Sequence, residues 1–362
     1  MDAVVPVGDR RFAINRGGTG RRTAIVVGEL RDDADGLGLA RTATIACDDR
    51  LVGSAVSDDQ YALAGESGVA LADLTIAHPL NLLVAVPGYR PLSSSLTVAA
   101  LAPRPVRHDL ALRRLPVSLR GRVSGRTAGP NPVYQPVSAA SVAIIGPAGP
   151  GGELPLLLAQ ALPEDPVAGA TLRNRALTAL GPAQVTVLEA ARQDDPFVSL
   201  ADPGAIAAGS VLRFGTPHSG FWGEVSELIA HPDRPAPAVL AWLTAPLAGS
   251  VRAGDLADAF AKGAYSGPTT TPVGAAWGGE AVVWVDALPA NGAVLVLRQP
   301  GRPDRYFDRN VLTGSDGDYA ILGLARMATL ELQVSAPGFV SQTRSFPVAR
   351  IGSGPLDWLL AP

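Results

Sequence analysis

Two stretches of the chain alternate apolar and polar residues with a period of two. This spacing is typical of β-strands that bury one face, because successive side chains point to opposite sides of a strand. The apolar positions are Leu82, Val84 and Val86 in the first stretch and Leu330, Leu332 and Val334 in the second. Both stretches are therefore predicted to be half-buried strands.

Each predicted strand ends in a Pro-Gly-aromatic sequence, which is typical of a turn because glycine tolerates positive φ. A tyrosine that follows an acidic turn precedes each strand, Tyr61 after SDDQ and Tyr319 after SDGD. The first copy has eight additional residues, which a longer hairpin loop would accommodate at little entropic cost. The turn residues are Pro87, Gly88 and Tyr89 in the first copy and Pro337, Gly338 and Phe339 in the second.

Two further strand patterns precede each copy, AIVVGELRD and ARTATIAC in the first, AVVWVDA and GAVLVLRQ in the second. A third set with the same order of strand, turn and strand occupies residues 117–146, but it has no Pro-Gly-aromatic ending. The pattern therefore predicts related modules in tandem.

This order of strands and turns resembles the carboxypeptidase regulatory-like, or transthyretin-like, β-sandwich module. The resemblance is best over 278–348, fair over 23–98 and partial over 117–146, and it rests on the D-G-x-Y turn and the A-P-G-F strand end. It implies a fold and no catalytic residue, because enzymes with this module carry their zinc-binding catalytic domain as a separate unit. No H-x-x-E motif occurs in this sequence.

Residues 195–256 resemble small β domains of modular bacterial and phage-tail-like proteins, and Leu256 to Lys262 is predicted to form a short helix before a Pro/Thr/Gly linker. The expected fold class is all-β, with tandem transthyretin-like or Ig-like β-sandwich modules and a small inserted β domain. The expected domains are an N-terminal sandwich at 1–115, a partial second sandwich at 116–194, a small β domain with the short helix and linker at 195–275, and a C-terminal sandwich at 276–362.

Composition supports a folded β protein. The chain has 362 residues, 47% hydrophobic and 17% charged, so it has ample apolar surface to bury. Forty glycines and 32 prolines favour turns between short strands over helices. The net charge of −3, with scattered basic residues, gives no electrostatic footprint for nucleic acid.

The cysteine content and the N-terminal sequence indicate where the protein is expected to be located and whether it inserts into a membrane. Cys47 is the single cysteine, which excludes an intramolecular disulfide and predicts a half-buried strand residue. The N-terminus lacks the basic and apolar regions of a secretory signal, and no apolar run reaches the length of a membrane-spanning helix. We therefore expect no membrane insertion and a cytoplasmic location.

Candidate chemistry is sparse. His218, Ser219 and Glu224 lie close together in sequence and would suit a serine hydrolase, but the G-x-S-x-G elbow is absent and a loop is the simpler interpretation. The four histidines do not have metal-ligand spacing, the acidic turns RDDADG and SDGD lack a complete calcium-loop pattern, and the glycine-rich segments lack a phosphate-binding frame. We expect no catalytic, metal or cofactor-binding residues.

Phe221 and Trp222 are the candidate interaction residues, because adjacent aromatics in a loop could stack on a sugar or a partner protein. Anchoring of a sandwich core is the more common role of such residues.

The expected function is that of a non-enzymatic structural subunit that docks other protein subunits within a large assembly. A phage-tail-like contractile injection particle put together in the cytoplasm fits best. The alternatives are an adhesin or glycan-binding protein and, less favoured, the hydrolase at His218 and Ser219.

Overall fold

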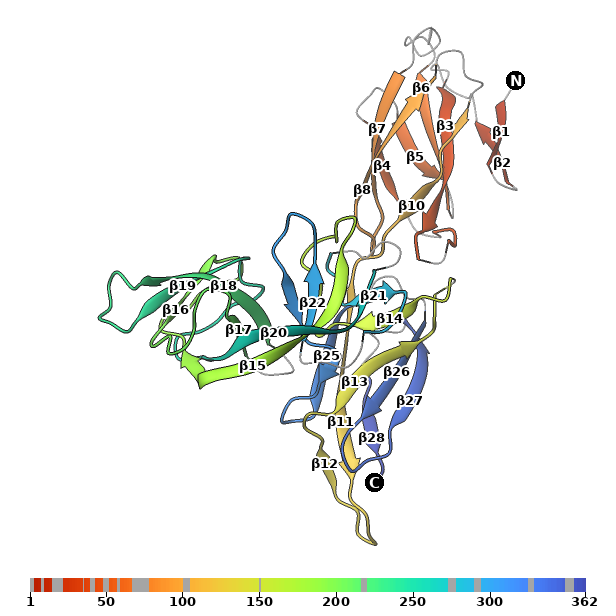
Figure 1. The fold of residues 1–362 in the computed structure, drawn as a ribbon. Coiled ribbons are helices and arrows are strands. Elements are labelled where there is room, and N and C mark those ends of the chain that lie inside the picture. The colour runs from red at the N-terminus through yellow and green to blue at the C-terminus, as the bar shows by residue number, and fades with distance from the viewer. Residues whose placement is uncertain are drawn as a thin grey trace. The chain divides into compact units, whose positions relative to one another are not determined.

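The structure is a computed structural model, and it describes most of the chain. The described residues are 3–7, 10–14, 22–34, 36–39, 43–47, 52–56, 59–66, 78–99, 105–149, 151–215, 220–272, 278–289, 294–324, 329–348 and 355–362. They form 28 strands and no α-helix, which confirms the all-β prediction (Figure 1). No described segment is a helix that could span a bilayer. The chain divides into two compact units, which meet in sequence between Leu115 and Pro116.

Unit 1 contains a five-stranded and a three-stranded sheet, together with a separate hairpin of β1 (Ala3–Val7) and β2 (Arg10–Ile14). The first sheet has the order β10-β3-β6-β5, with β9 also paired to β3, and the second has the order β4-β7-β8. The strands of the first sheet are β3 (Arg22–Asp32), β5 (Val52–Val56), β6 (Gln60–Glu66), β9 (Val106–Arg107) and β10 (Leu110–Leu112). Those of the second are β4 (Thr44–Cys47), β7 (His78–Ala85) and β8 (Leu92–Val98).

The core of unit 1 lies between these two sheets. It contains buried side chains from both, among them Val26 and Leu63 of the first sheet and Leu82 and Val84 of the second. The alternation predicted around Leu82 is therefore confirmed as a core face. Cys47 is partly buried at the edge of this core, as the sequence predicted.

Unit 2 contains a second sandwich whose strands come from two distant parts of the chain. Its first sheet has the order β12-β11-β25, with β28 also paired to β11, and its second has the order β24-β13-β26-β27. The strands of the first sheet are β11 (Val117–Arg126), β12 (Tyr134–Pro136), β25 (Asp318–Leu324) and β28 (Trp358–Leu360). Those of the second are β13 (Ser141–Gly146), β24 (Val311–Leu312), β26 (Thr329–Ser335) and β27 (Gln342–Pro347).

These pairings change the predicted domain boundaries at 194/195 and 275/276. The strands at 117–146 were expected to belong to a partial module of their own, but β11 pairs with β25 and β13 pairs with β26. The Pro-Gly-aromatic ending that seemed missing from 117–146 is the one at Pro337, Gly338 and Phe339. Local patterns alone do not distinguish one complete sandwich interrupted by an insertion from two incomplete ones.

The two sandwiches have corresponding details. Gly28 of β3 lies opposite Tyr61 of β6, whose hydroxyl donates to the carbonyl of His108. Gly121 of β11 lies opposite Tyr319 of β25, whose hydroxyl donates 2.8 Å to the carbonyl of Leu356. A Cβ at either glycine would lie 1.9 Å from that carbonyl oxygen, so only glycine fits. Burial raises the pKa of Tyr319 to about 12.

The Pro-Gly turns also correspond in the two sandwiches. Gly88 has φ of 86° and Gly338 has φ of 81°, in the region that glycine adopts readily. Tyr89, beyond the first turn, donates a hydrogen bond of 2.7 Å to Asp32. The ring of Phe339, beyond the second, lies against Gly125 of β11, where a Cβ would come within 2.4 Å of it. Both turns therefore help to connect strands of different sheets.

The segment between β13 and β24 forms two barrels that share the long antiparallel strands β15 (Thr171–Thr186) and β20 (Leu256–Thr270) (Figure 1). Leu256 to Lys262, predicted to be helical, begins β20 instead. Its alternate residues Ala257 and Ala259 are completely buried, and pairing to two neighbouring strands outweighs the helix propensity of its alanines.

Barrel 1 contains one half of each shared strand together with β16 (Phe197–Leu200), β17 (Val211–Phe214), β18 (Phe221–Ala230) and β19 (Val239–Leu243). The pairing runs β15-β20-β17-β18-β19-β16. A bridge between Val187 and Leu200 returns it to the end of β15 and closes the barrel. The interior includes Val198, Phe214, Val225 and Leu243. The predicted small β domain at 195–275 thus corresponds to most of barrel 1, but β15 is needed to close it.

Barrel 2 contains the other halves of the shared strands together with β14 (Leu154–Leu157), β21 (Val282–Val285), β22 (Val294–Arg298) and β23 (Arg305–Phe307). Bridges between Leu158 and Arg309 and between Pro272 and Val285 complete the circuit. The interior includes Leu156, Leu172, Val283 and Leu295. The strand patterns at 278–298, assigned from sequence to the C-terminal sandwich, therefore belong to this barrel.

The buried glycine of unit 2 gives a direct test of the fold. Changing Gly121 to Ala should destabilise unit 2 by about 3 kcal/mol, because the added methyl group collides with a backbone carbonyl that cannot move without breaking β28 pairing. All five tryptophans lie beyond residue 220, so tryptophan fluorescence during urea unfolding reports on unit 2 alone. Gly28→Ala, the corresponding change in unit 1, is the control. Equal shifts of the fluorescence midpoint in both variants would contradict separate units.

The interrupted sandwich predicts a second outcome. Replacing residues 149–308 with a short Gly/Ser linker should leave the sandwich folded, because Val142 and Val311 are paired neighbours in one sheet and their ends can be joined by a hairpin. Trp358, which is 2% exposed, is then the only tryptophan. Blue-shifted emission that is lost cooperatively in urea is expected. Emission typical of a solvent-exposed tryptophan would show that the sandwich depends on the barrels.

Candidate functional site

The candidate hydrolase residues His218 and Ser219 lie outside the described residues. Glu224, the acidic residue considered with them, is in β18 and is bound to other side chains. The two acidic turns have structural partners. Asp32 accepts hydrogen bonds from Arg114 and Tyr89, and Asp318 forms an ion pair with Arg122. Among the described residues, no group of three or more His, Cys, Asp or Glu side chains could hold a metal ion.

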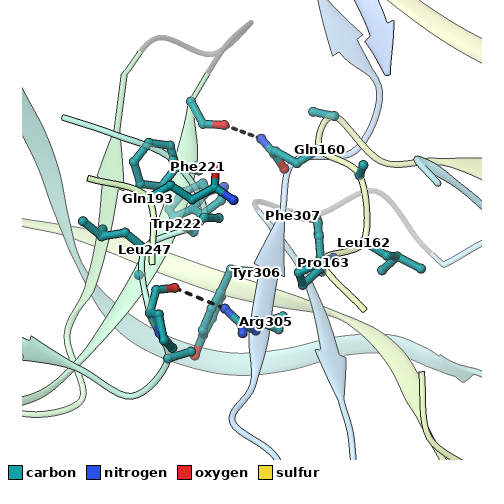
Figure 2. A pocket seen from close by; sticks show the side chains of 18 of the residues that line it. Gln160, Leu162, Pro163, Gln193, Phe221, Trp222, Leu247, Arg305, Tyr306 and Phe307 are labelled. Atoms are coloured by element: carbon teal, nitrogen blue, oxygen red, sulfur yellow. Dashed lines mark hydrogen bonds between the residues drawn. The ribbon is translucent and has the colours of Figure 1, made fainter. Parts of the chain in front are cut away.

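Phe221 and Trp222, the predicted interaction residues, begin β18 and line a pocket of about 590 Å³ (Figure 2). The pocket lies between the two barrels, with Leu322 of β25 also in its lining. Figure 2 shows these aromatics and Leu247 on one wall, with Leu162, Pro163 and Phe307 on the other. A cavity of this size with apolar walls is typical of a binding site.

Trp222 is held by contacts from both barrels. Arg213, its partner across β17 and β18, lies over the indole ring at 5.2 Å, within the range of a cation–π contact. Asp308, which follows β23 of barrel 2, accepts hydrogen bonds from the Trp222 indole nitrogen at 3.2 Å and from Arg213 at 3.0 Å. The indole is therefore fixed in orientation at the pocket wall.

Phe221 packs beside Trp222 within barrel 1. Its ring stacks on Phe214 with a centroid separation of 5.3 Å, and it lies so close to Gly249 that a Cβ there would come within 2.7 Å of it. Both predicted residues thus anchor structure on one side and line the pocket on the other.

A second carboxylate, that of Glu224, also links the two barrels. Glu224 accepts a hydrogen bond of 2.7 Å from Lys262 of β20 and one of 2.5 Å from the hydroxyl of Tyr306 in β23. Burial and the nearby Glu224 carboxylate raise the pKa of Tyr306 far above its ordinary value. Tyr306 therefore stays protonated and acts as a hydrogen-bond donor.

Two polar side chains of the pocket have binding capacity left. The Gln160 amide nitrogen donates 2.5 Å to the carbonyl of Gly220, while its buried amide oxygen has no hydrogen-bond partner in the described structure. Arg305 donates one long bond of 3.4 Å to the carbonyl of Pro246, and burial lowers the pKa of its guanidinium. A ligand that offers a donor to Gln160 or an acceptor to Arg305 would satisfy them.

The arrangement suits binding more than proton transfer, because Asp308 and Glu224 are each committed to a cation and to a second donor. Sequence reasoning found the aromatic wall but missed Gln160, Arg305, Tyr306 and Asp308. These residues lie 59 or more positions from their barrel 1 partners, and no local motif marks them.

Comparisons of the chain with family models, with curated proteins and with solved structures found no match.

The link between the barrels can be tested at Asp308. Asp308→Asn should lower the stability of unit 2 by about 2 kcal/mol, because it removes a charge-assisted bond to the mostly buried Arg213. Urea unfolding followed by tryptophan fluorescence measures the change. Asp318→Asn, which breaks the exposed pair with Arg122, is the matched control and should leave the midpoint unchanged. An unchanged midpoint for Asp308→Asn would show that the ion pair does not join the barrels.

Proposed function

We propose that the chain is a non-enzymatic structural subunit that docks other protein subunits in a large assembly. A phage-tail-like contractile injection particle, put together in the cytoplasm, is the setting that fits best. This setting follows from the sequence resemblance of residues 195–256 to domains of such proteins.

The observation that carries the proposal is that, within the described residues, both sandwiches have sheet edges with no strand paired to them. β8 ends the sheet β4-β7-β8 of unit 1, and β27 ends the sheet β24-β13-β26-β27 of unit 2. Large apolar residues are exposed at end strands of unit 2. Tyr134 of β12, which ends the sheet order β12-β11-β25, is 59% exposed, and Val340 before β27 is 61% exposed. Exposed strand edges with apolar side chains favour association with other chains.

A glycan-binding or adhesin function is the second candidate, and the pocket is the observation that favours it. Aromatic side chains with nearby amides offer a stacking face and hydrogen bonds to a sugar ring. Trp222 and Gln160 have this arrangement.

Affinity purification of the tagged chain from its native cells, with mass spectrometry and negative-stain imaging, tests the proposal. The expected result is stoichiometric recovery with sheath, tube or baseplate-type proteins as a particle. A clean monomer without partners would overturn it. Glycan-array binding by that monomer, lost in Trp222→Ala, would then establish the second candidate.

A further inference from the structure

The two sandwiches differ at one strand edge. In unit 1, β6 pairs with β3 on one side and with β5 on the other. In unit 2, the corresponding strand β25 pairs with β11, and within the described residues no strand pairs with its other edge. The two strands match closely in sequence, Tyr-Ala-Leu-Ala-Gly from Tyr61 and Tyr-Ala-Ile-Leu-Gly from Tyr319.

Hydrogen bonds fix which backbone groups point to that edge. The carbonyl of Arg120 accepts a hydrogen bond from the amide of Leu356, so the backbone groups of Arg120 point away from β25. Arg120 and Ala320, which lie opposite each other, are therefore a non-hydrogen-bonded pair of the antiparallel ladder. The N–H and C=O of Ala320 therefore point to the outer edge. No bond to either group occurs in the described structure.

The equivalent residue in unit 1 shows what such an edge accepts. The carbonyl of Val27 accepts from His108, and Ala62, opposite Val27, directs its backbone groups toward Ser54 of β5. Ala62 and Ala320 occupy the same place in the two sandwiches. An additional antiparallel strand is thus the natural occupant of the edge at Ala320.

The open edge is short. At one end the amide of Gly314 donates to the carbonyl of Asp318, and at the other the amide of Ala281 donates to the carbonyl of Gly323. The four residues 319–322 remain, a span of about 13 Å at the rise of an antiparallel strand. A short extended segment fits this opening, whereas a long strand does not.

The pocket adjoins this edge. Ala320 and Leu322 line it, and Leu322 is 44% exposed. Residues directly opposite each other in an antiparallel pair point to the same face of the sheet, so the residue opposite Ala320 would direct its side chain toward the pocket. There it would meet the wall of Phe221, Trp222 and Phe307, and the unpartnered oxygen of Gln160 could accept from the added segment.

We propose that β25 accepts a short extended segment of a partner subunit as an added strand, with a large apolar side chain of that segment seated in the pocket. This inference rests on the proposed function, since it names the surface by which the subunit docks. Pairing of backbone groups supplies affinity in this mode of recognition, and the pocket supplies specificity.

Synthetic peptides give the direct test. β5 has the sequence Val-Gly-Ser-Ala-Val, with Ser54 opposite Ala62. The capped peptide Val-Gly-Trp-Ala-Val places an aromatic side chain at that position, and Val-Gly-Asp-Ala-Val places a charge there. Calorimetric titration of the full chain should give at least tenfold tighter binding of the Trp peptide than of the Asp peptide. Equal binding of the two, or binding of neither, would overturn the inference.

Variants of the edge locate the binding. Leu322→Glu puts a charge at the pocket mouth from an exposed position, and Ala320→Pro removes the outward N–H without removing a bond to β11. Each should weaken the Trp peptide at least tenfold with an unchanged urea midpoint. Ala230→Glu, at an exposed position of β18 in barrel 1, is the control and should bind as the parent chain does. Weakening by Ala230→Glu to the same extent would overturn the assignment to β25.

Recovery from native cells separates this inference from the proposed function. Loss of Leu322→Glu from the particle, with Ala230→Glu retained, supports the inference. Retention of Leu322→Glu overturns it and leaves the proposed function standing. Absence of the unmodified chain from any particle overturns the proposed function, and the peptide titration then decides the inference alone. A dimer of this chain that Leu322→Glu dissociates, or glycan binding that it abolishes, would replace the partner strand as occupant.

Discussion

Pairing between β11 and β25 is the constraint on which the organisation of unit 2 depends. Arg122 and Asp318, paired across these strands, are 196 residues apart. Because β13 also pairs with β24, the inserted segment leaves and re-enters the sandwich at neighbouring strands. Loop-closure entropy grows slowly with length, so a folded insertion of this size costs the sandwich little once its ends lie side by side.

The insertion is stabilised by two strands that both barrels share, in addition to the core of each barrel. β15 and β20 each run through both barrels, so their ladder crosses from one interior to the other without a linker. Val211 of barrel 1 packs in one buried cluster with Val296 and Tyr306 of barrel 2. The carboxylates of Asp308 and Glu224 bridge the same junction. The pocket is the space that remains beside this junction. The side chains of its wall are oriented by the hydrogen bonds and ion pairs of these two carboxylates.

The sequence predicted strands where hydrophobic alternation was clear and turns where Pro-Gly stood, because both are local properties. It failed where the decision was not local. Leu256 to Lys262 has good helix formers, and its strand conformation comes from pairing with β15 and β17. The choice between two partial sandwiches and one interrupted sandwich depends on which distant strands pair, and the patterns at 117–146 fit either. Phe221 and Trp222 could be recognised from the sequence as adjacent aromatics. The opposite wall of the pocket consists of barrel 2 residues that are distant in sequence and come near them only when the barrels close.

The insertion and the open edge have one origin in the topology. In unit 1 the chain between β4 and β6 is short and supplies β5, which covers β6. In unit 2 the chain between β13 and β25 carries the barrels, and the last strand before β25, β24, pairs with β13 in the other sheet. No segment is then left in the described chain to cover Ala320. The same arrangement that builds the pocket therefore exposes the strand edge beside it, so the apolar wall and the free backbone groups occur together and can act on one bound segment.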